Sequence, residues 1–411
     1  MSVSLICVFN DPAVREQCLD RSLAGADPDR VELVSVDNTE HRFATAGAAL
    51  NHGARLARHD VVAFVHQDVY LHSWSRLLEV AALIGSGAWA VLGAAGVGAR
   101  GEAVGLLRDR VQLIGASAPV PVAVESLDEV LFMVSRDLVL AEPLAEDPDL
   151  AWHAYAVEYA VRQRRQGRRV GAVDLAITHN SLTVNLARLT EAHHRVAELH
   201  PAAVPVPTTC GVVGAEPGRL RSTPLVRRHG WRRRGVLESL AARRAHDRAG
   251  TGRAVLADIR LDVDDVALVP GERFRVVNLD RTGSFCEVAG EPLELTRRGT
   301  PFELVSVNRP ADLLPHLRSE AGGPLLCTNL TLDDLAQLGA AGTIGEDTVL
   351  GIHESDIWLL AGLTVDRLPR AWLSGRAVPF SALRPLPADP RPRDLARATV
   401  PGGPSVSERG W

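Results

Sequence analysis

Three short apolar runs alternate with helix-like stretches in the first 65 residues of the chain. The runs Val3–Val8, Val31–Val36 and Val61–Val65 are rich in β-branched residues, as buried parallel strands are. Asp11-Pro12 supplies an N-cap and a first-turn proline for one helix, and the alanine-rich stretch Thr45–Ala57 favours a second. This strand–helix–strand–helix–strand order predicts an α/β domain with a parallel sheet and right-handed crossovers.

Polar residues stand where the predicted strands end. Asn10, Asp37 and Asp68 follow the three runs, and His179 follows a later predicted strand, Val170–Ile177. Because ligands of open α/β sheets bind beyond the carboxyl ends of the strands, these side chains are candidate site residues. Asp68 can hold Mg²⁺ or Mn²⁺, the imidazole of His179 suits Mn²⁺, and Asp37 can accept hydrogen bonds from a base or ribose. The pattern fits an enzyme that handles an anionic nucleotide with a divalent cation.

The length of 411 residues suggests at least two domains. Residues 1–200 carry the alternating strands and helices and form the first predicted domain. Residues 201–250 contain a proline- and glycine-rich linker and a basic helix. Residues 251–384 contain shorter strands, turns and a helix, which predict a smaller mixed α/β domain of unassigned role. The Pro/Arg/Gly-rich tail, residues 385–411, is expected to be disordered.

Charge and cysteine usage narrow the function classes. A net charge of −5 gives no support for nucleic-acid binding. The 5 cysteines are scattered without C-x-x-C spacing, which argues against a zinc knuckle or disulfide framework and for a reducing compartment. No apolar stretch approaches the ~20 residues of a membrane span, and the first run lacks the basic start of a signal peptide, so we expect a cytoplasmic protein. The basic stretch Arg227–Arg248 is interpreted as a solvated helix face, with peripheral membrane contact or an anionic acceptor as alternatives.

A set of motifs between Val36 and Ser181 carries a family resemblance. The most specific is the run Phe-Val-His-Gln-Asp-Val from Phe64 to Val69. The others, in chain order, are Val36-Asp37-Asn38, Asn51-His52-Gly53, Leu127-Asp128-Glu129, Trp152-His153-Ala154-Tyr155, Gln163-Arg164-Arg165-Gln166-Gly167 and Thr178-His179-Asn180-Ser181. Together they resemble a branch of the family 2-like glycosyltransferases in which F-x-H-Q-D-V replaces the commoner Asp-x-Asp motif. The resemblance implies a GT-A fold (a Rossmann-like, mainly parallel sheet), a UDP-sugar or related donor, Mn²⁺ or Mg²⁺, and inversion at the anomeric carbon.

The resemblance also implies roles for single residues. The implied donor-binding residues are Asn10, Asp37, Asn51 and Asp68. Metal ligation is implied for Asp68 and His179, and Asp128 falls in the segment that resembles the family's acceptor region.

The expected general base is missing. In the family an aspartate follows the tyrosine of the motif, whereas here Ala156 follows Tyr155. Alanine cannot take a proton from an acceptor. Either Glu158, His153 or Asp149 takes this role, or the acceptor needs little activation, or the domain binds without turnover. Glu158 also has an ordinary structural interpretation, as a helix ion pair.

Three interpretations follow. The first is a glycosyltransferase that moves a sugar from a nucleotide-diphosphate donor to a hydroxyl of a glycan, natural product or protein. The second is a non-catalytic domain that binds a nucleotide sugar or glycan as part of an assembly, which Ala156 favours. The third makes the C-terminal domain the functional one, with the N-terminal domain as its specificity partner. Donor hydrolysis in the presence of metal distinguishes the first from the second.

Overall fold

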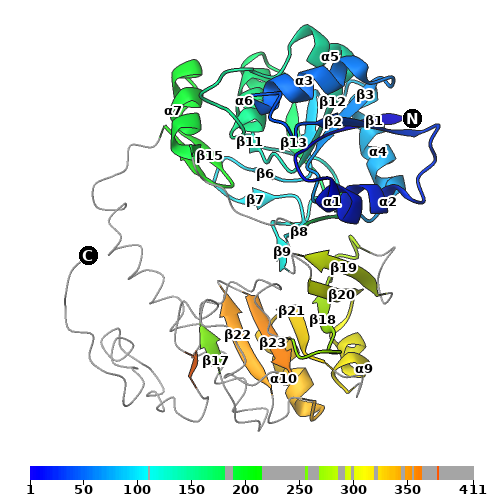
Figure 1. Ribbon diagram of the computed structural model, residues 1–411. Helices are drawn as coiled ribbons and strands as arrows, with labels where there is room; N and C mark the ends of the chain where they lie inside the picture. The colour runs from blue at the N-terminus through cyan, green and yellow to red at the C-terminus, as the bar shows by residue number, and fades with distance from the viewer. Residues whose placement is uncertain are drawn as a thin grey trace, which may run out of the picture. The chain divides into compact units, whose positions relative to one another are not determined.

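The chain divides into two compact units in the computed structural model (Figure 1). The first comprises Met1–Glu216 with Thr282–Val288, and the second comprises Pro217–Arg281 with Ala289–Trp411. The structure describes residues 1–109, 112–180, 188–214, 255–257, 268–285, 292–297, 300–318, 323–343, 348–353, 356–362 and 377–378. Ser181, the basic stretch 227–248 and the tail 385–411 lie outside these ranges.

The first unit is built on a seven-stranded sheet of described residues, in the order β10-β13-β5-β12-β3-β1-β2. The strands are β1 (Val3–Phe9), β2 (Val31–Asp37), β3 (Val61–Val65), β5 (Val91–Gly93), β10 (Val122–Ala123), β12 (Leu131–Ser135) and β13 (Val170–Ala172). β1 pairs in parallel with β2 and β3, and β5 pairs in parallel with β13. β12 is antiparallel to both β3 and β5, so β5 and β13 run in the same direction as β1. The predicted α/β unit with a mainly parallel sheet is confirmed.

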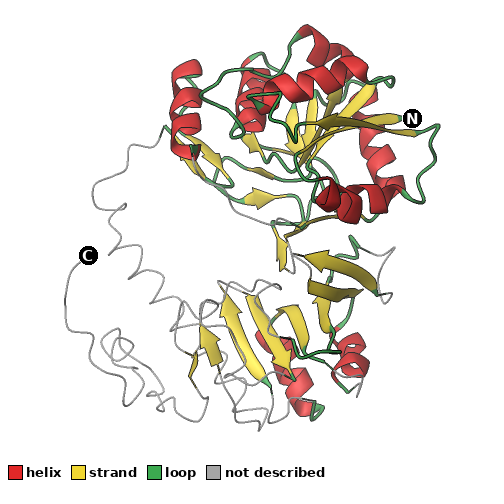
Figure 2. Ribbon diagram, in the orientation of Figure 1, coloured by secondary structure: helices red, strands yellow, loops and turns green. Residues whose placement is uncertain are grey.

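The helices cover both faces of this sheet (Figure 2). They are α1 (Pro12–Arg15), the π-helical turn η1 (Glu16–Asp20), α2 (Arg21–Leu23), α3 (Ala46–Leu56), α4 (Trp74–Gly85), α5 (Arg136–Ala141), α6 (Tyr155–Arg165) and α7 (Leu189–Leu199). The side chain of Asp11 accepts hydrogen bonds from the backbone at the start of α1, and Thr45 caps α3. Asp11 follows β1 after one residue and Thr45 follows β2 after a short loop. Each of these strands is therefore followed by a capped helix, as the sequence predicts.

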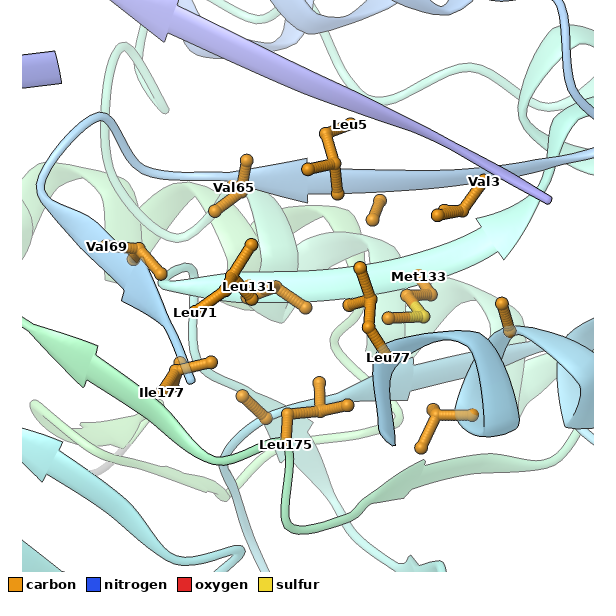
Figure 3. Packing of buried hydrophobic residues seen from close by; sticks show 14 of the residues in the cluster. Val3, Leu5, Val65, Val69, Leu71, Leu77, Leu131, Met133, Leu175 and Ile177 are labelled. Atoms are coloured by element: carbon orange, nitrogen blue, oxygen red, sulfur yellow. The ribbon is translucent and has the colours of Figure 1, made fainter. Parts of the chain in front are cut away.

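Residues that alternate along the strands enter two separate cores. Leu5 of β1 packs in the core beneath α4, and Ile6 packs in the core beneath α3. Figure 3 shows Leu77 of α4 beside Met133 of β12 in the first of these cores. In the second, a Cβ added to Gly53 of α3 would lie 2.3 Å from Ile6 Cγ2, so only glycine allows this close approach.

Two predicted elements are shorter than the sequence suggests. A helix was expected from Asp149, but α6 begins at Tyr155 because Ala151 and Ala154 have left-handed backbones with φ of 47° and 54°. The strand expected over Val170–Ile177 is split into β13 and β14 (Ile177–His179). Between them Ala176 has φ of 48°, and β14 joins a different sheet.

The first unit continues beyond residue 200, where the sequence places the start of a linker. β15 (Val206–Thr208) and β16 (Gly211–Val213) form an antiparallel hairpin. Val206 and Val213 are 1% and 0% exposed and pack in one cluster with Val157 of α6 and Val196 of α7. Each strand of the hairpin has a single buried residue, Val206 or Val213, and the prolines and glycines around them hide this pattern in the sequence.

The second unit contains a mixed eight-stranded sheet among its described residues, in the order β19-β20-β18-β21-β23-β22-β17-β24. Its strands are β17 (Val255–Ala257), β18 (Phe274–Leu279), β19 (Leu293–Arg297), β20 (Thr300–Val307), β21 (Leu325–Leu330), β22 (Val349–His353), β23 (Asp356–Ala361) and β24 (Ala377–Val378). Its helices are the 3-10 helix η4 (Pro310–Leu313), α9 (Leu314–Leu317) and α10 (Leu332–Ala340). Leu335 and Leu338 of α10 pack on the central strands, and this second, mixed α/β core is the one expected from the sequence.

In neither unit do the described residues include a helix with the length and apolar character that crossing a membrane requires.

Candidate functional site

Three side chains with metal-binding chemistry meet at the carboxyl end of β3. His66 and Asp68 lie in the turn between β3 and β4 (Val69–Leu71), and His179 ends β14. β14 is antiparallel to β4, with His179 opposite Val69, so the pairing brings His179 back to this turn. One ligand atom from each of the three residues lies within 4.8 Å of the other two. His179 Nε2 is 3.5 Å from Asp68 Oδ1.

The electrostatics of this cluster suit a cation. Burial disfavours the Asp68 carboxylate, but the imidazoles of His179 and His66 outweigh it and lower its pKa to about 2. Burial disfavours protonation of His179, but Asp68 and Asp109 outweigh it and raise its pKa to about 10. The site therefore holds a positive charge as a proton on His179 in the metal-free chain, and a metal ion that binds there must displace this proton. Burial lowers the pKa of His66, which keeps that imidazole neutral and available as a ligand. In the part of the chain that the structure describes, Asp68 Oδ1 is buried with no hydrogen-bond partner, so a divalent cation would satisfy it.

Asp109 orients His179. Asp109 ends β8 (Leu107–Asp109), which pairs in parallel with β14 and places the two residues opposite one another. Its Oδ1 is 3.3 Å from His179 Nδ1, so the other ring nitrogen, Nε2, is turned toward Asp68. A carboxylate behind a histidine ligand is a common arrangement at metal sites.

A pocket of about 580 Å³ opens beside the cluster. Its walls include the strand-end residues Asn10, Asn38, Gln67 and Asp68, together with residues of the 151–155 segment. This volume is in the range of sites that hold a small ligand. The pocket therefore lies where open α/β sheets bind ligands, at the carboxyl ends of adjacent strands.

Gln67 joins two of these strand ends. Its Oε1 accepts the backbone N–H groups of Asn10 and Asp11 at 3.1 Å each, and its Nε2 donates to Asn10 Oδ1 at 2.7 Å. Gln67, which stands between His66 and Asp68 in the sequence, thus links the ends of β1 and β3 at the pocket wall and is not part of the metal-binding cluster.

The predicted donor-binding residues have different positions. Asn10 and Asp68 line the pocket. Asp37 accepts hydrogen bonds from Thr39 N and Thr39 Oγ1 at 2.8 and 2.7 Å, which lower its pKa, and its neighbour Asn38 lines the pocket instead. Asn51 is buried in α3.

The role of Asn51 in the structure is to hold α3 against the following segment. Its Nδ2 donates to Leu144 O at 2.9 Å, and its Oδ1 accepts from Leu144 N at 3.0 Å. The side chain is 2% exposed, and the structure does not bring it to the pocket wall.

The two candidate general bases, His153 and Glu158, lie in different environments. His153 lines the pocket. Glu158 is 3% exposed, and its Oε1 accepts from Arg162 Nε at 3.0 Å and lies 2.9 Å from His200 Nε2. This geometry matches the structural interpretation of Glu158, on the side of α6 that packs toward α7. Ala156 is 1% exposed in the core beneath α3.

Asp128 follows β11 (Ser126–Leu127), and both of its carboxylate oxygens are occupied. Oδ1 accepts from Val130 N at 3.0 Å and Oδ2 accepts from Thr209 Oγ1 of the β15–β16 hairpin at 2.7 Å. Its charge acts on His66, so it lies near the cluster without belonging to it.

Sequence reasoning missed His66, Asp109 and Tyr155. His66 stands inside the quoted motif, so its place one residue after a strand was a usable signal. Tyr155 also lies in a motif, and its hydroxyl is 3.1 Å from His66 Nε2. Asp109 had no such signal, because it reaches the site only through the pairing of β8 with β14.

No protein-family model matches the chain, and no curated protein matches it. Among solved structures, it is similar to that of S. aureus TarS 1–349, with 16% identity over 48% of this chain and 65% of that one and a TM-score of 0.34. It is also similar to the mannosyltransferase PcManGT from Pyrobaculum calidifontis in complex with GDP-Man and Mn²⁺ (13% identity, 49% of this chain, 64% of that one, TM-score 0.35). A third similar structure is GalNAc-T7 with UDP, GalNAc and Mn²⁺ (12% identity, 48% of each chain, TM-score 0.35). The chain spans less than two thirds of the length of each of these three structures.

Proposed function

We propose that the first unit is a metal-dependent glycosyltransferase of the GT-A kind. It takes a nucleoside-diphosphate sugar, a UDP-sugar in the first instance, and transfers the sugar with inversion to a hydroxyl of a glycan, natural product or protein. The observation that carries the proposal is the convergence of His66, Asp68 and His179 beside a ligand-sized pocket at the strand ends.

These three residues would hold Mn²⁺ or Mg²⁺. Two imidazoles and a carboxylate suit Mn²⁺ in particular, and the cation would neutralise the charge of the departing diphosphate. Asn10 lines the same pocket and has an amide Nδ2 that can donate to a nucleoside there. Asn38 also lines it, but its carboxamide is held by hydrogen bonds to the backbone of Phe43. Arg188, at the start of α7, adds a cationic side chain to the wall that favours an anionic ligand.

The test is nucleotide binding by calorimetry, with UDP and UDP-hexoses and the full chain. EDTA should abolish binding and Mn²⁺ should restore it. Asp68→Ala should reduce the affinity at least about tenfold while circular dichroism stays unchanged, because Asp68 lies outside the cores. Asp29→Ala, an exposed loop residue, is the matched control and should bind as wild type does. Undiminished, metal-independent binding by the Asp68 variant would refute the assignment.

A non-catalytic binding domain is the second candidate, favoured by the buried Ala156 at the expected base position. An active transferase slowly hydrolyses its donor, because water replaces the acceptor. Metal-dependent release of free sugar therefore favours catalysis, and tight binding without release at any pH favours the binding domain.

A further inference from the structure

A short segment from the second half of the sequence belongs to the first unit. Thr282–Val288 lies between β18 and β19 in the sequence, yet it packs with the first unit. Phe285 in this segment is 1% exposed and shares an apolar cluster with Leu106 and Ala176. These two residues immediately precede β8 and β14. The segment therefore packs at the starts of the two strands whose ends lie at the cation cluster.

The ring of Phe285 contacts two buried polar side chains. The guanidinium carbon of Arg108, in β8, lies over the ring at 4.3 Å from its centroid. The imidazole of His72 meets the ring at an interplanar angle of 83°, with the centroids 5.1 Å apart. Arg108 and His72 are 0% and 6% exposed. Because an aromatic face attracts a guanidinium most strongly away from water, Phe285 stabilises Arg108 in this position.

Arg108 and His72 also reach the same hydroxyl group in β14. His72 Nε2 is 2.7 Å from Thr178 Oγ1, and Arg108 Nη1 donates to the same oxygen at 3.4 Å. Arg108 and Thr178 stand opposite one another in the parallel pairing of β8 with β14, and His72 directly follows β4. The buried hydroxyl of Thr178 therefore joins three chain segments behind the cation cluster.

The cation cluster lies on the other side of the same strands. The next residues along β8 and β14 are Asp109 and His179, which are also paired with one another. Successive residues of a strand point to opposite faces. Arg108 and Thr178 therefore point toward Phe285 and His72, whereas Asp109 and His179 point toward the cluster. The position of the His179 ring in the cluster thus depends on how β8 and β14 are held from behind.

We infer, on the basis of the metal site in the proposed function, that Phe285 is a positioning residue for that site. Its ring holds Arg108, and Arg108 and Thr178 fix the strands that carry Asp109 and His179. Phe285 lies outside the described lining of the donor pocket, so it acts on metal affinity through these strands and not through a nucleotide contact. A segment from the second half of the sequence is therefore needed for full metal affinity in the first unit.

The test compares Phe285→Leu with Phe274→Leu in the full chain. Leucine fills much of the space of the ring but offers no aromatic face to Arg108. Phe274, in β18 of the second unit, is 0% exposed and provides the same substitution at an equally buried position. Phe285→Tyr keeps the aromatic face, and Phe285 borders a cavity of about 290 Å³ that has room for the added hydroxyl. Calorimetric titration with Mn²⁺ alone measures the affinity of each variant, and circular dichroism checks that it is folded.

Phe285→Leu should weaken Mn²⁺ binding about 10-fold, as loss of a group that orients a metal ligand does. Phe285→Tyr and Phe274→Leu should bind as the wild type does. Wild-type affinity in Phe285→Leu overturns the inference. Equal losses in Phe285→Leu and Phe274→Leu also overturn it, because they would reflect a general loss of packing, and so do equal losses in the leucine and tyrosine variants of Phe285.

Thr178→Val is the second variant and keeps the inference testable if Phe285→Leu does not fold. Valine has nearly the same shape as threonine but lacks the oxygen that Arg108 and His72 share. This variant should also lose about 10-fold in Mn²⁺ affinity, and wild-type affinity would contradict the coupling through Thr178. A wild type that binds no Mn²⁺ would instead refute the metal site of the proposed function itself.

Discussion

Glu158 should behave as a structural residue when it is removed. Its carboxylate accepts from Arg162 Nε and Nη2 at 3.0 and 3.2 Å and lies 2.9 Å from His200 Nε2. The side chains of Glu158 and His200 are 4% and 9% exposed. Glu158→Ala would leave both partners buried or half-buried without their acceptor.

The expected cost follows from this burial. Removing one member of a buried ion pair costs about 3–5 kcal/mol, because the remaining charge is desolvated and unpaired. Arg162 is 24% exposed and keeps a hydrogen bond to Pro143 O, so the lower end of this range, about 3 kcal/mol, is expected. The matched control is Glu125→Ala, which removes the ion-pair partner of Arg164. The side chains of Glu125 and Arg164 are 30% and 32% exposed, so this change should lower the free energy of unfolding by less than about 1 kcal/mol.

Hydrogen exchange of α6 and α7 peptides in the native chain measures both values, since it reports local free energies without requiring the two units to unfold together. Glu158→Ala should accelerate exchange in both helices, and Glu125→Ala should leave it nearly unchanged. Equal, small effects of the two variants would refute the buried-pair argument. Loss of donor hydrolysis with normal protection in Glu158→Ala would identify Glu158 as a catalytic residue and contradict its structural interpretation.

Two further outcomes are expected. Burial raises the pKa of Glu129 to about 8, so the folded chain binds more protons than the unfolded chain between about pH 4.5 and 8. The free energy of unfolding of the wild type should therefore fall as pH rises through this window, by roughly 5 kcal/mol at most. Glu129→Gln should therefore raise the melting temperature at pH 8 in EDTA and leave it unchanged at pH 4; equal melting curves at pH 8 would contradict the buried carboxylate. Asp109→Ala should weaken Mn²⁺ binding about 10–100-fold by freeing the ring of His179, and Asp109→Asn, which keeps an acceptor, should lose less. Calorimetric titration with Mn²⁺ alone measures this, and unchanged affinity in the alanine variant would exclude the positioning role.

The sheet was predictable because its signal is local. β1, β2 and β3 each read as β-branched runs, and the cap at Asp11 follows from its own side chain. The wrong helix start comes from backbone conformations that the alanine residue type does not predict. Ala151 and Ala154 belong to the residue type with the highest helix propensity, yet both are left-handed, so a helix predicted from composition starts too early.

The candidate site divides in the same way. Asp68 and His179 could be identified because each lies at, or within three residues of, the end of a strand, and His66 could have been identified by the same rule. Asp109 could not, because its position depends on the tertiary pairing of β8 with β14. Asn51 was misleading for a related reason, since the polar side chain of a motif can serve a buried backbone contact as well as a ligand.

The β15–β16 hairpin sets a lower limit on where a fragment of the first unit can end. A protein truncated after His200 would lack Val206 and Val213 and would present the apolar faces of α6 and α7 to water. Each buried valine contributes roughly 1.5–3 kcal/mol, so the loss is comparable to a large part of the 5–15 kcal/mol that stabilises a typical domain. The truncation would also remove Thr209 from Asp128, so a recombinant fragment of the first unit should extend to at least Gly214.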